Sequence, residues 1–347
     1  MSAIADVARI AGVSKSTASR ALSGRGYVSD ATRERVVQAA ADLGFVVSSA
    51  AASLVTGQTR NVGVVIPAFD RWFFAEVLEG IEDALTTAGY DLTLYRLSTD
   101  PQRRRRVFDY FLVRKRVDAV IAVGISLSRH EVDLLHSLGK PIVGIGGEIE
   151  GIATLSIDDA AAARFMTEHL VSLGHTRILH LGGDIDEQTD FHVQDQRLTG
   201  VRLALEAAGL AHDGDFRKVP YTVEGGYEGA LAVLAVPGSR PTAIVAGCDE
   251  IAIGAIIAAR QLGIHVPAQL SIVGIDGHNL AAMFGLTTLE QHPARQGAKA
   301  VSVILERLAN QEADPADDRI VMPVTLAVRT STTAPPLDDS AGEAIAV

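Results

Sequence analysis

The amino-acid sequence predicts an all-α helix-turn-helix head followed by an α/β body of two doubly wound parallel-sheet lobes. Before residue 46, apolar residues recur only at the spacing of helical turns. After residue 60, short β-branched runs alternate with longer amphipathic segments, which is typical of parallel βα units. The chain has 347 residues, 48% of them hydrophobic and 21% charged, which is enough for two or three globular domains.

The stretch DVARIAGVSKSTASRAL at 6–22 predicts two short helices joined by a tight turn. The apolar face of the first helix comprises Ile4, Val7, Ala8 and Ala11. Gly12 can end that helix, and Ser14 can cap the next one. The apolar face of the second helix comprises Ala18, Ala21 and Leu22. Its outward polar side chains are Lys15, Ser16, Ser19 and Arg20.

A third helix is needed to bury these two apolar faces. Ser29 or Asp30 can cap it, and Gly44 can end it. Its apolar face comprises Val36, Ala40 and Leu43. The three helices predict a helix-turn-helix unit over 1–46, although the spacing alone also fits an ordinary helical hairpin with a solvated polar face.

The charge distribution favours a nucleic-acid reader over an ordinary hairpin. Residues 1–60 contain seven Lys or Arg against four Asp or Glu, whereas the whole chain has a net charge of −11. A basic module on an acidic body suits a protein whose head alone approaches phosphates.

Other classes of protein lack support. Cys248 is the only cysteine, which excludes an internal disulfide and a four-thiolate metal site. We find no secretion signal and no apolar run long enough to span a membrane, so we expect a cytoplasmic protein. There is no dinucleotide fingerprint, Walker loop, H-E-x-x-H or G-x-S-x-G, and therefore no cofactor, metal or catalytic residue is expected. The four arginines at 103–106 indicate a solvated helix face.

The body alternates buried strands with amphipathic helices. Strands are predicted at 61–67, 118–124, 140–146, 177–183, 242–247 and 270–276. Helices are predicted at roughly 73–88, 101–115, 129–138, 159–173, 192–208, 224–236, 249–262 and 293–310. Five helices end in a glycine that can adopt the left-handed conformation: Gly89, Gly139, Gly174, Gly209 and Gly263. We interpret Asp158 and Asp159 as a helix start, and Asp317 and Asp318 as a surface turn.

A core over 61–334 is too long for one comfortable doubly wound sheet, and 147–158 resembles a change of lobe. We predict one lobe from about 61–158 and 291–319, and a second from about 159–290 and 320–332. A final strand over 320–329 completes one lobe, and 335–347 forms a disordered tail. Ligands of open α/β sheets bind at the carboxyl ends of the strands, so a cleft is expected between the lobes.

The join at 47–60, VSSAAASLVTGQTR, is Ala-rich and can make about two helical turns. So short a helix is marginal in water unless it packs against something. The segment is therefore either a plain linker or a hinge helix that forms conditionally.

These motifs resemble the lactose-repressor (LacI/GalR) family of transcriptional regulators. IADVARIAGVSKSTASRAL is similar to its head, SSAAASL to its hinge, and IVAGCDEIAIGAIIAARQLGIHVPAQLSIVGIDG to its body. The resemblance covers residues 1 to about 332. It implies a homodimer that binds a palindromic double-stranded DNA operator, with a body like periplasmic sugar-binding proteins and a small effector, most readily a sugar, that controls operator affinity allosterically. The alternatives are a stand-alone sugar-binding receptor and a sugar-converting enzyme.

The resemblance assigns the DNA contacts by position. Lys15, Ser16 and Arg20 would meet base edges, with Ile4 beside them, and Arg20 can fork onto guanine. The expected phosphate contacts are Ser14, Thr17, Ser19, Tyr27, Ser29 and Thr32. Leu54 matches the hinge leucine that wedges into the minor groove, unless it only packs within the hinge. Val47 and Ala52 depart from the Pro and Arg common there, which predicts weaker anchoring.

The resemblance also assigns an effector site. Arg197 and Asp276 match the two polar anchors, since a guanidinium and a carboxylate suit vicinal hydroxyls. Asp70, Phe73 and Phe74 match the cleft wall, and Tyr221 an aromatic platform for a sugar face. Trp72 replaces the usual Pro, and Cys248 stands where many sugar-binding members have Asn. Arg197 could instead form a structural ion pair, Phe73 and Phe74 could be core residues, and Cys248 is expected to be a small buried side chain.

Overall fold

The computed structural model describes residues 4–23, 26–45, 58–97, 100–112, 117–183, 192–211, 215–236, 238, 240–310 and 319–336. The chain divides into two compact units, 1–60 and 61–347, which are described separately. Most of the predicted hinge, including Leu54, and the tail from 337 onward lie outside the described residues.

The head is the predicted three-helix unit. Its helices are α1 (Ile4–Ile10), α2 (Lys15–Ser23) and α3 (Asp30–Asp42). One small core unites their apolar faces, formed by the buried side chains of Val7, Ala8, Ala11, Ala18, Ala21, Val36, Ala39 and Ala40. Gly12 has a φ of +67°, as expected of the residue that ends α1. The helical spacing in the sequence therefore predicted the core of the head.

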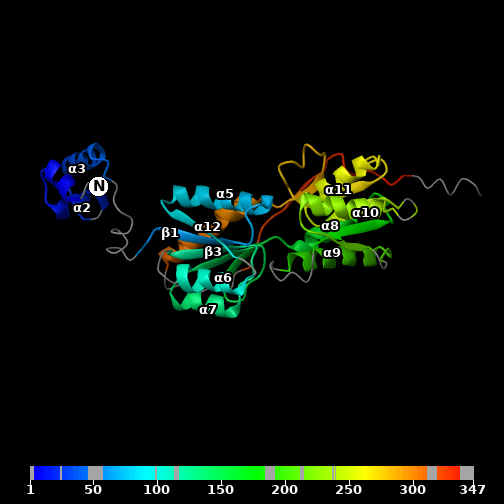
Figure 1. Ribbon diagram of the computed structural model, residues 1–347, viewed down its shortest axis with the longest axis horizontal. Helices are drawn as coiled ribbons and strands as arrows, with labels where there is room; N and C mark the ends of the chain where they lie inside the picture. The colour runs from blue at the N-terminus through cyan, green and yellow to red at the C-terminus, as the bar shows by residue number, and fades with distance from the viewer. Residues whose placement is uncertain are drawn as a thin grey trace, which may run out of the picture. The chain divides into compact units, whose positions relative to one another are not determined.

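The body contains two six-stranded sheets, each with helices on both faces (Figure 1), which confirms the predicted fold class. The first sheet has the order β11-β5-β4-β3-β1-β2 and is parallel throughout. Its strands are β1 (Asn61–Ile66), β2 (Asp91–Arg96), β3 (Ala119–Val123), β4 (Ile142–Ile145), β5 (Ala153–Ser156) and β11 (Arg319–Val321). Around it lie α5 (Trp72–Thr87), α6 (Pro101–Arg106) with a π-helical turn (Val107–Leu112), α7 (Arg129–Ser137) and α12 (Pro293–Ala309). We call this assembly the first lobe.

The second lobe has the strand order β12-β10-β9-β8-β6-β7. Its strands are β6 (Ile178–Gly182), β7 (Phe216–Lys218), β8 (Ala243–Ala246), β9 (Ser271–Asp276), β10 (Thr287–Glu290) and β12 (Thr325–Ala327). Its helices are α8 (Asp159–Ser172), α9 (Val193–Ala207), α10 (Val223–Leu234) and α11 (Asp249–Gln261). Buried aliphatic clusters fill the space between each face of the sheet and its helix pair.

Local sequence signals account for the boundaries of these elements. All five predicted helix-ending glycines have positive φ, from +63° at Gly139 to +96° at Gly174. Asp158 caps α8 by accepting a hydrogen bond from the backbone N–H of Ala161 at 2.9 Å, so the predicted helix start is confirmed. At Gly80 an added Cβ would lie 1.9 Å from the carbonyl oxygen of Ala294, so α5 and α12 touch backbone to backbone.

The predicted single strand over 320–329 is wrong. The segment forms two short strands, β11 in the first sheet and β12 in the second, joined by three residues. In the second sheet β12 pairs antiparallel with β10. The predicted helix over 101–115 is also interrupted, because its regular part ends at Arg106.

Three connections join the lobes, and all run at the same side of the two sheets. They follow β5, β10 and β11, and they lead into α8, α12 and β12 respectively. The carboxyl ends of the parallel strands of both sheets consequently face a common space, in which ligands of open α/β sheets bind.

Candidate functional site

The outer face of α2 carries exposed polar side chains, as the helical spacing predicts. They are Lys15, Ser16, Ser19 and Arg20. The backbone N–H of Thr17 donates to Ser14 Oγ at 3.1 Å, which caps the helix as expected. Ser14 Oγ also lies 2.8 Å from both Ser16 Oγ and Thr17 Oγ1. The N-terminus of α2 thus presents a cluster of hydroxyls at the positive end of the helix dipole.

The other head residues predicted to contact DNA differ in how exposed they are. The side chain of Tyr27 is 93% exposed. Ser29 occupies the N-cap position of α3, but its hydroxyl donates to Thr32 Oγ1 at 2.9 Å and does not cap the helix backbone. Ile4 is partly buried against the head core, which limits how far it can reach outward.

A cavity of about 690 Å³ lies between the two lobes of the body. Loops at the carboxyl ends of eight strands, β1, β3, β4, β5, β6, β7, β8 and β10, contribute to it, together with the end of β9 and the first turns of α5, α8, α9 and α12. The residues that line it are Pro67, Ala68, Arg71, Phe73, Phe74, Gly124, Gly146, Ile157, Asp159, Gly183, Val193, Gln194, Arg197, Lys218, Val219, Pro220, Tyr221, Thr222, Cys248, Asp276, Gln291 and Gln296.

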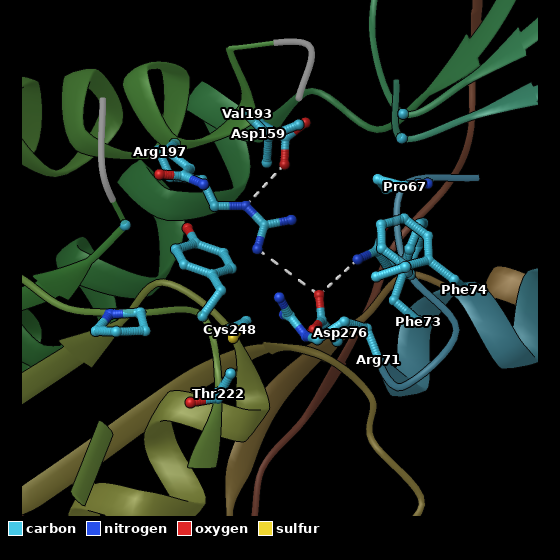
Figure 2. Close-up of a pocket in the computed structure, with 18 of the residues that line it drawn as sticks. Pro67, Arg71, Phe73, Phe74, Asp159, Val193, Arg197, Thr222, Cys248 and Asp276 are labelled. Carbon is cyan, nitrogen blue, oxygen red and sulfur yellow. Dashed lines mark hydrogen bonds and ion pairs between the residues drawn. The ribbon is translucent and has the colours of Figure 1, made fainter. Parts of the chain in front are cut away.

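Arg197 is the polar centre of this cavity (Figure 2). Its Nε donates to Asp159 Oδ1 at 2.8 Å, an Nη donates to the carbonyl oxygen of Gly247, and the same Nη lies 3.7 Å from Asp276 Oδ1. Burial alone would lower the pKa of Arg197, but the two carboxylates outweigh it and raise the pKa above its usual range. The ion pair between α8 and α9 that the sequence left open is therefore present, and the same guanidinium lines the cavity.

Asp276 is the last residue of β9, and its carboxyl group is buried. Its Oδ1 accepts a hydrogen bond from Gln291 Nε2 at 2.6 Å. Its φ of +145° lies in a region that non-glycine residues rarely adopt, and such strain concentrates at functional sites. Burial raises the pKa of Asp276 to about 7, opposed by Arg197 and reinforced by the nearby Asp249 carboxylate.

Aromatic rings form the wall opposite these anchors. Phe73 and Phe74, from the first turn of α5, lie across the cavity from Arg197 and Asp276 in Figure 2. Their ring centroids are 5.6 Å apart with an edge-to-face angle of 73°. Both rings also pack against the core of the first lobe. They are therefore cavity-lining residues and core residues at once. Tyr221 lines the cavity from the second lobe.

Of two further residues predicted for the effector site, Cys248 lines the cavity and Asp70 does not. Cys248 is 1% exposed, and burial raises the pKa of its thiol, which keeps it neutral. It is the small buried side chain that the sequence analysis expected, and it lines the cavity. Asp70 is exposed and is absent from the cavity lining, so the structure does not bring it to the other predicted residues.

Sequence reasoning missed Arg71, Asp159, Gln291 and Gln296. Asp159 was interpreted only as part of a helix start, because nothing in the sequence shows that it meets a residue 38 positions away. Gln291 directly follows β10, a strand that the pattern did not predict, and Gln296 follows on α12. Had β10 been predicted, the rule that ligands bind beyond strand ends would have indicated Gln291.

The described ranges hold no group of three or more His, Cys, Asp or Glu side chains placed to bind a metal ion. Within the same ranges, every helix is too short or too polar to cross a membrane.

Comparison with known proteins identifies the class. Residues 3–48 match the bacterial regulatory proteins of the lacI family, and residues 167–332 match a periplasmic binding protein-like domain. The chain is 30% identical over 326 residues to the HTH-type transcriptional repressor PurR of Vibrio vulnificus, covering 90% of this chain and 94% of the relative. The chain belongs to the lacI family: it is a DNA-binding transcriptional repressor with an effector domain, and it is not an enzyme.

Two solved structures share the fold. A lac repressor dimer bound to operator and the anti-inducer ONPF superimposes with a TM-score of 0.83 at 24% identity, covering 96% of this chain and 99% of that one. A complex of the transcriptional regulator CelR with cellobiose superimposes with a TM-score of 0.69 at 26% identity, covering 95% of this chain and all of that one.

Proposed function

We propose that the protein is a homodimeric repressor whose affinity for a palindromic operator is controlled by a small carbohydrate bound between its lobes. The observation that carries this proposal is the buried Arg197–Asp276 pair, which faces an aromatic wall in the cavity between the lobes. A guanidinium and a carboxylate can hold the hydroxyls of a sugar, and aromatic rings can stack on its C–H face.

The head supports operator binding through its exposed α2 face. In this proposal Lys15, Ser16 and Arg20 contact base edges in the major groove, beside Ile4. The side chains proposed to contact phosphates are Ser14, Thr17, Ser19, Tyr27, Ser29 and Thr32. Leu54, which lies outside the described residues, is proposed as the minor-groove wedge. Two copies of such a head suit a palindrome, and the lac repressor structure cited above is a dimer on its operator.

The effector residues proposed for the cavity are Phe73, Phe74, Arg197, Tyr221, Cys248 and Asp276. To these we add Asp159 and Gln291, because each is hydrogen-bonded to one of the two anchors. The CelR complex shows that a related regulator binds a disaccharide, which favours the same class of ligand here. Asp70 is withdrawn from the set because it is exposed outside the cavity lining.

Control of DNA binding follows from linkage between the two ligands. An effector that prefers one angle between the lobes shifts the population toward that angle, and with it the separation of the two heads of a dimer. A coupling free energy of ~1–3 kcal/mol would change operator affinity about 5- to 150-fold.

Two experiments test the proposal. Thermal-shift screening covers mono- and disaccharides, with nucleobases included because aromatic rings also stack on planar heterocycles. A ligand at ~100 times its dissociation constant stabilises by ~2.7 kcal/mol, which is easily detected. A response to nucleobases alone would overturn the carbohydrate assignment.

Operator binding is tested by selecting duplexes from a random-sequence pool with the full-length protein. We expect a two-fold symmetric consensus whose recovery changes when the screened ligand is added. Selection of an asymmetric sequence, or of none, would overturn the dimeric repressor.

A further inference from the structure

We infer that Arg71 and Trp72 are positioning residues that clasp the two lobes together and hold the aromatic wall against the effector anchors. The inference rests on the proposed function, because it concerns the same cavity. We use the term clasp for the contacts of these two residues with Glu250 and His278.

The first half of the clasp is an ion pair. Arg71 is the N-cap residue of α5 in the first lobe, and Glu250 lies in the first turn of α11 in the second lobe. Arg71 Nε donates to Glu250 Oε2 at 2.8 Å, and the two side chains are only 23% and 11% exposed. The Arg71 guanidinium also lies 5.8 Å from the ring centroid of Tyr221 in the second lobe. Partial burial makes such a pair stronger than one in open solvent.

The second half of the clasp is a ring contact. Trp72, the next residue in the chain, places its ring 4.7 Å from that of His278, with an angle of 32° between the planes. His278 follows β9 by two residues, directly after the anchor Asp276 and Gly277. Two consecutive residues of the first lobe thus contact three segments of the second: the loop at Tyr221, the start of α11 and the loop after β9.

The clasp and the aromatic wall belong to one helical turn. Arg71 and Trp72 are followed at once by Phe73 and Phe74, which line the cavity. Because a helical turn moves as a rigid unit, separating Arg71 from Glu250 would carry both phenyl rings away from Arg197 and Asp276. The clasp therefore sets how completely the cavity is closed.

One feature of the clasp favours the open arrangement of the lobes. Trp72 Nε1 is buried and has no hydrogen-bond partner among the described residues. A buried donor without an acceptor is costly, and opening the cleft would hydrate it. A favourable ion pair and an unsatisfied indole N–H leave the lobes poised between open and closed arrangements, as a ligand-controlled equilibrium requires.

The test uses the full-length protein without any ligand, and it exploits Trp72 as the only tryptophan of the chain. Glu250→Gln removes the charge of the ion pair and keeps the side-chain size. We expect the open-to-closed ratio to rise on the order of tenfold. Acrylamide quenching of Trp72 fluorescence and the radius of gyration from small-angle scattering should both increase.

The matched control is Glu131→Gln. Glu131 pairs with Arg104 at 2.6 Å within the first lobe, with side chains 10% and 26% exposed, nearly the same burial as the clasp pair. It should lower thermal stability without changing the quenching constant or the radius. If Glu250→Gln does not fold, His278→Ala is measured against the same control.

An unchanged quenching constant and radius in the folded clasp variant would overturn the inference, and so would an equal increase in Glu131→Gln. Neither measurement involves a sugar or DNA. The clasp can therefore be confirmed or overturned even if the carbohydrate screen fails.

Discussion

Gln291 Nε2 donates to Asp276 Oδ1 at 2.6 Å, so a proposed effector anchor is bonded directly to the segment by which the chain crosses from the second lobe to the first. Gln296 Nε2 in turn donates to the carbonyl oxygen of Gln291 at 2.8 Å. All three side chains are no more than 5% exposed. Buried hydrogen bonds therefore connect the Asp276 carboxylate to the start of α12.

Gln291→Ala tests this connection. Loss of the amide leaves Asp276 without its shortest hydrogen bond, so the carboxylate is less well held toward the cavity. We expect the dissociation constant of the carbohydrate found in the screen to rise about tenfold, which corresponds to ~1.4 kcal/mol, measured by isothermal titration calorimetry. The control is Gln261→Ala, which removes an exposed partner of the Tyr227 hydroxyl. Equal affinities in the two variants would show that Gln291 does not position the anchor.

Arg197→Ala should be severely destabilising. It leaves the buried carboxyl groups of Asp159 and Asp276 without their cation, and breaking a buried pair in this way costs ~3–5 kcal/mol. Urea unfolding measures the loss. Arg164→Ala is the matched control, because Arg164 pairs with Glu168 at 2.7 Å on the exposed side of α8 and should cost less than ~1 kcal/mol. Similar losses in both variants would contradict the assigned burial of Arg197.

The effect of Asp276→Asn on the free energy of unfolding should depend on pH. Burial raises the pKa of Asp276 to about 7, whereas an unfolded Asp titrates near ~3.9. The folded protein therefore holds a proton that the unfolded chain has lost, and the cost of ionising Asp276 grows as the pH rises between these values.

At about pH 3, below both pKa values, the substitution should thus be nearly neutral, and at pH 8 the variant should be more stable than the wild type. The difference should grow by up to ~1.4 kcal/mol per pH unit between about pH 4 and pH 7 and level off above that. Urea unfolding at several pH values measures it. A stability difference that does not vary between pH 5 and pH 8 would mean that Asp276 is already ionised at acid pH.

Arg20→Ala should reduce the preference of the head for the selected operator over a scrambled duplex by about 5- to 150-fold. Loss of a bidentate contact to a base costs ~1–3 kcal/mol of discrimination. Arg9→Ala is the control, because Arg9 is exposed on α1 and pairs only loosely with Asp6 at 3.8 Å. Fluorescence anisotropy with both duplexes measures the ratio, and undiminished discrimination in Arg20→Ala would move the base contact elsewhere.

The periodic signals in the sequence were sufficient for the head and for most of the body. The apolar faces of α1, α2 and α3 form the head core, and six strands and eight helices were placed within a few residues, except where the helix at 101 ends early. These elements depend on neighbours three or four positions apart, or on continuous buried runs, which are visible in the sequence.

The strands that were missed lack such signals. β2 is an edge strand with alternating partial exposure, β7 has three residues, and β5 and β10 contain polar Ser or Thr that only the folded sheets bury. The sequence also did not predict that 319–327 is divided between two sheets, because the neighbours of a strand depend on the packing of the complete fold.

The sequence by itself determined the helices and the buried strands, and through its resemblance to a family it predicted Arg197 and Asp276, which both line the cavity. Only the tertiary structure decided which groups surround them. Asp159 on α8 bonds to Arg197 on α9, and Gln291 bonds to Asp276 where the chain crosses between the lobes. Arg71 bonds to Glu250, which lies 179 positions later in the chain. Local periodicity reports which face of an element is buried, whereas these contacts depend on how the ends of distant strands converge, and that convergence is set by the packing of two complete sheets.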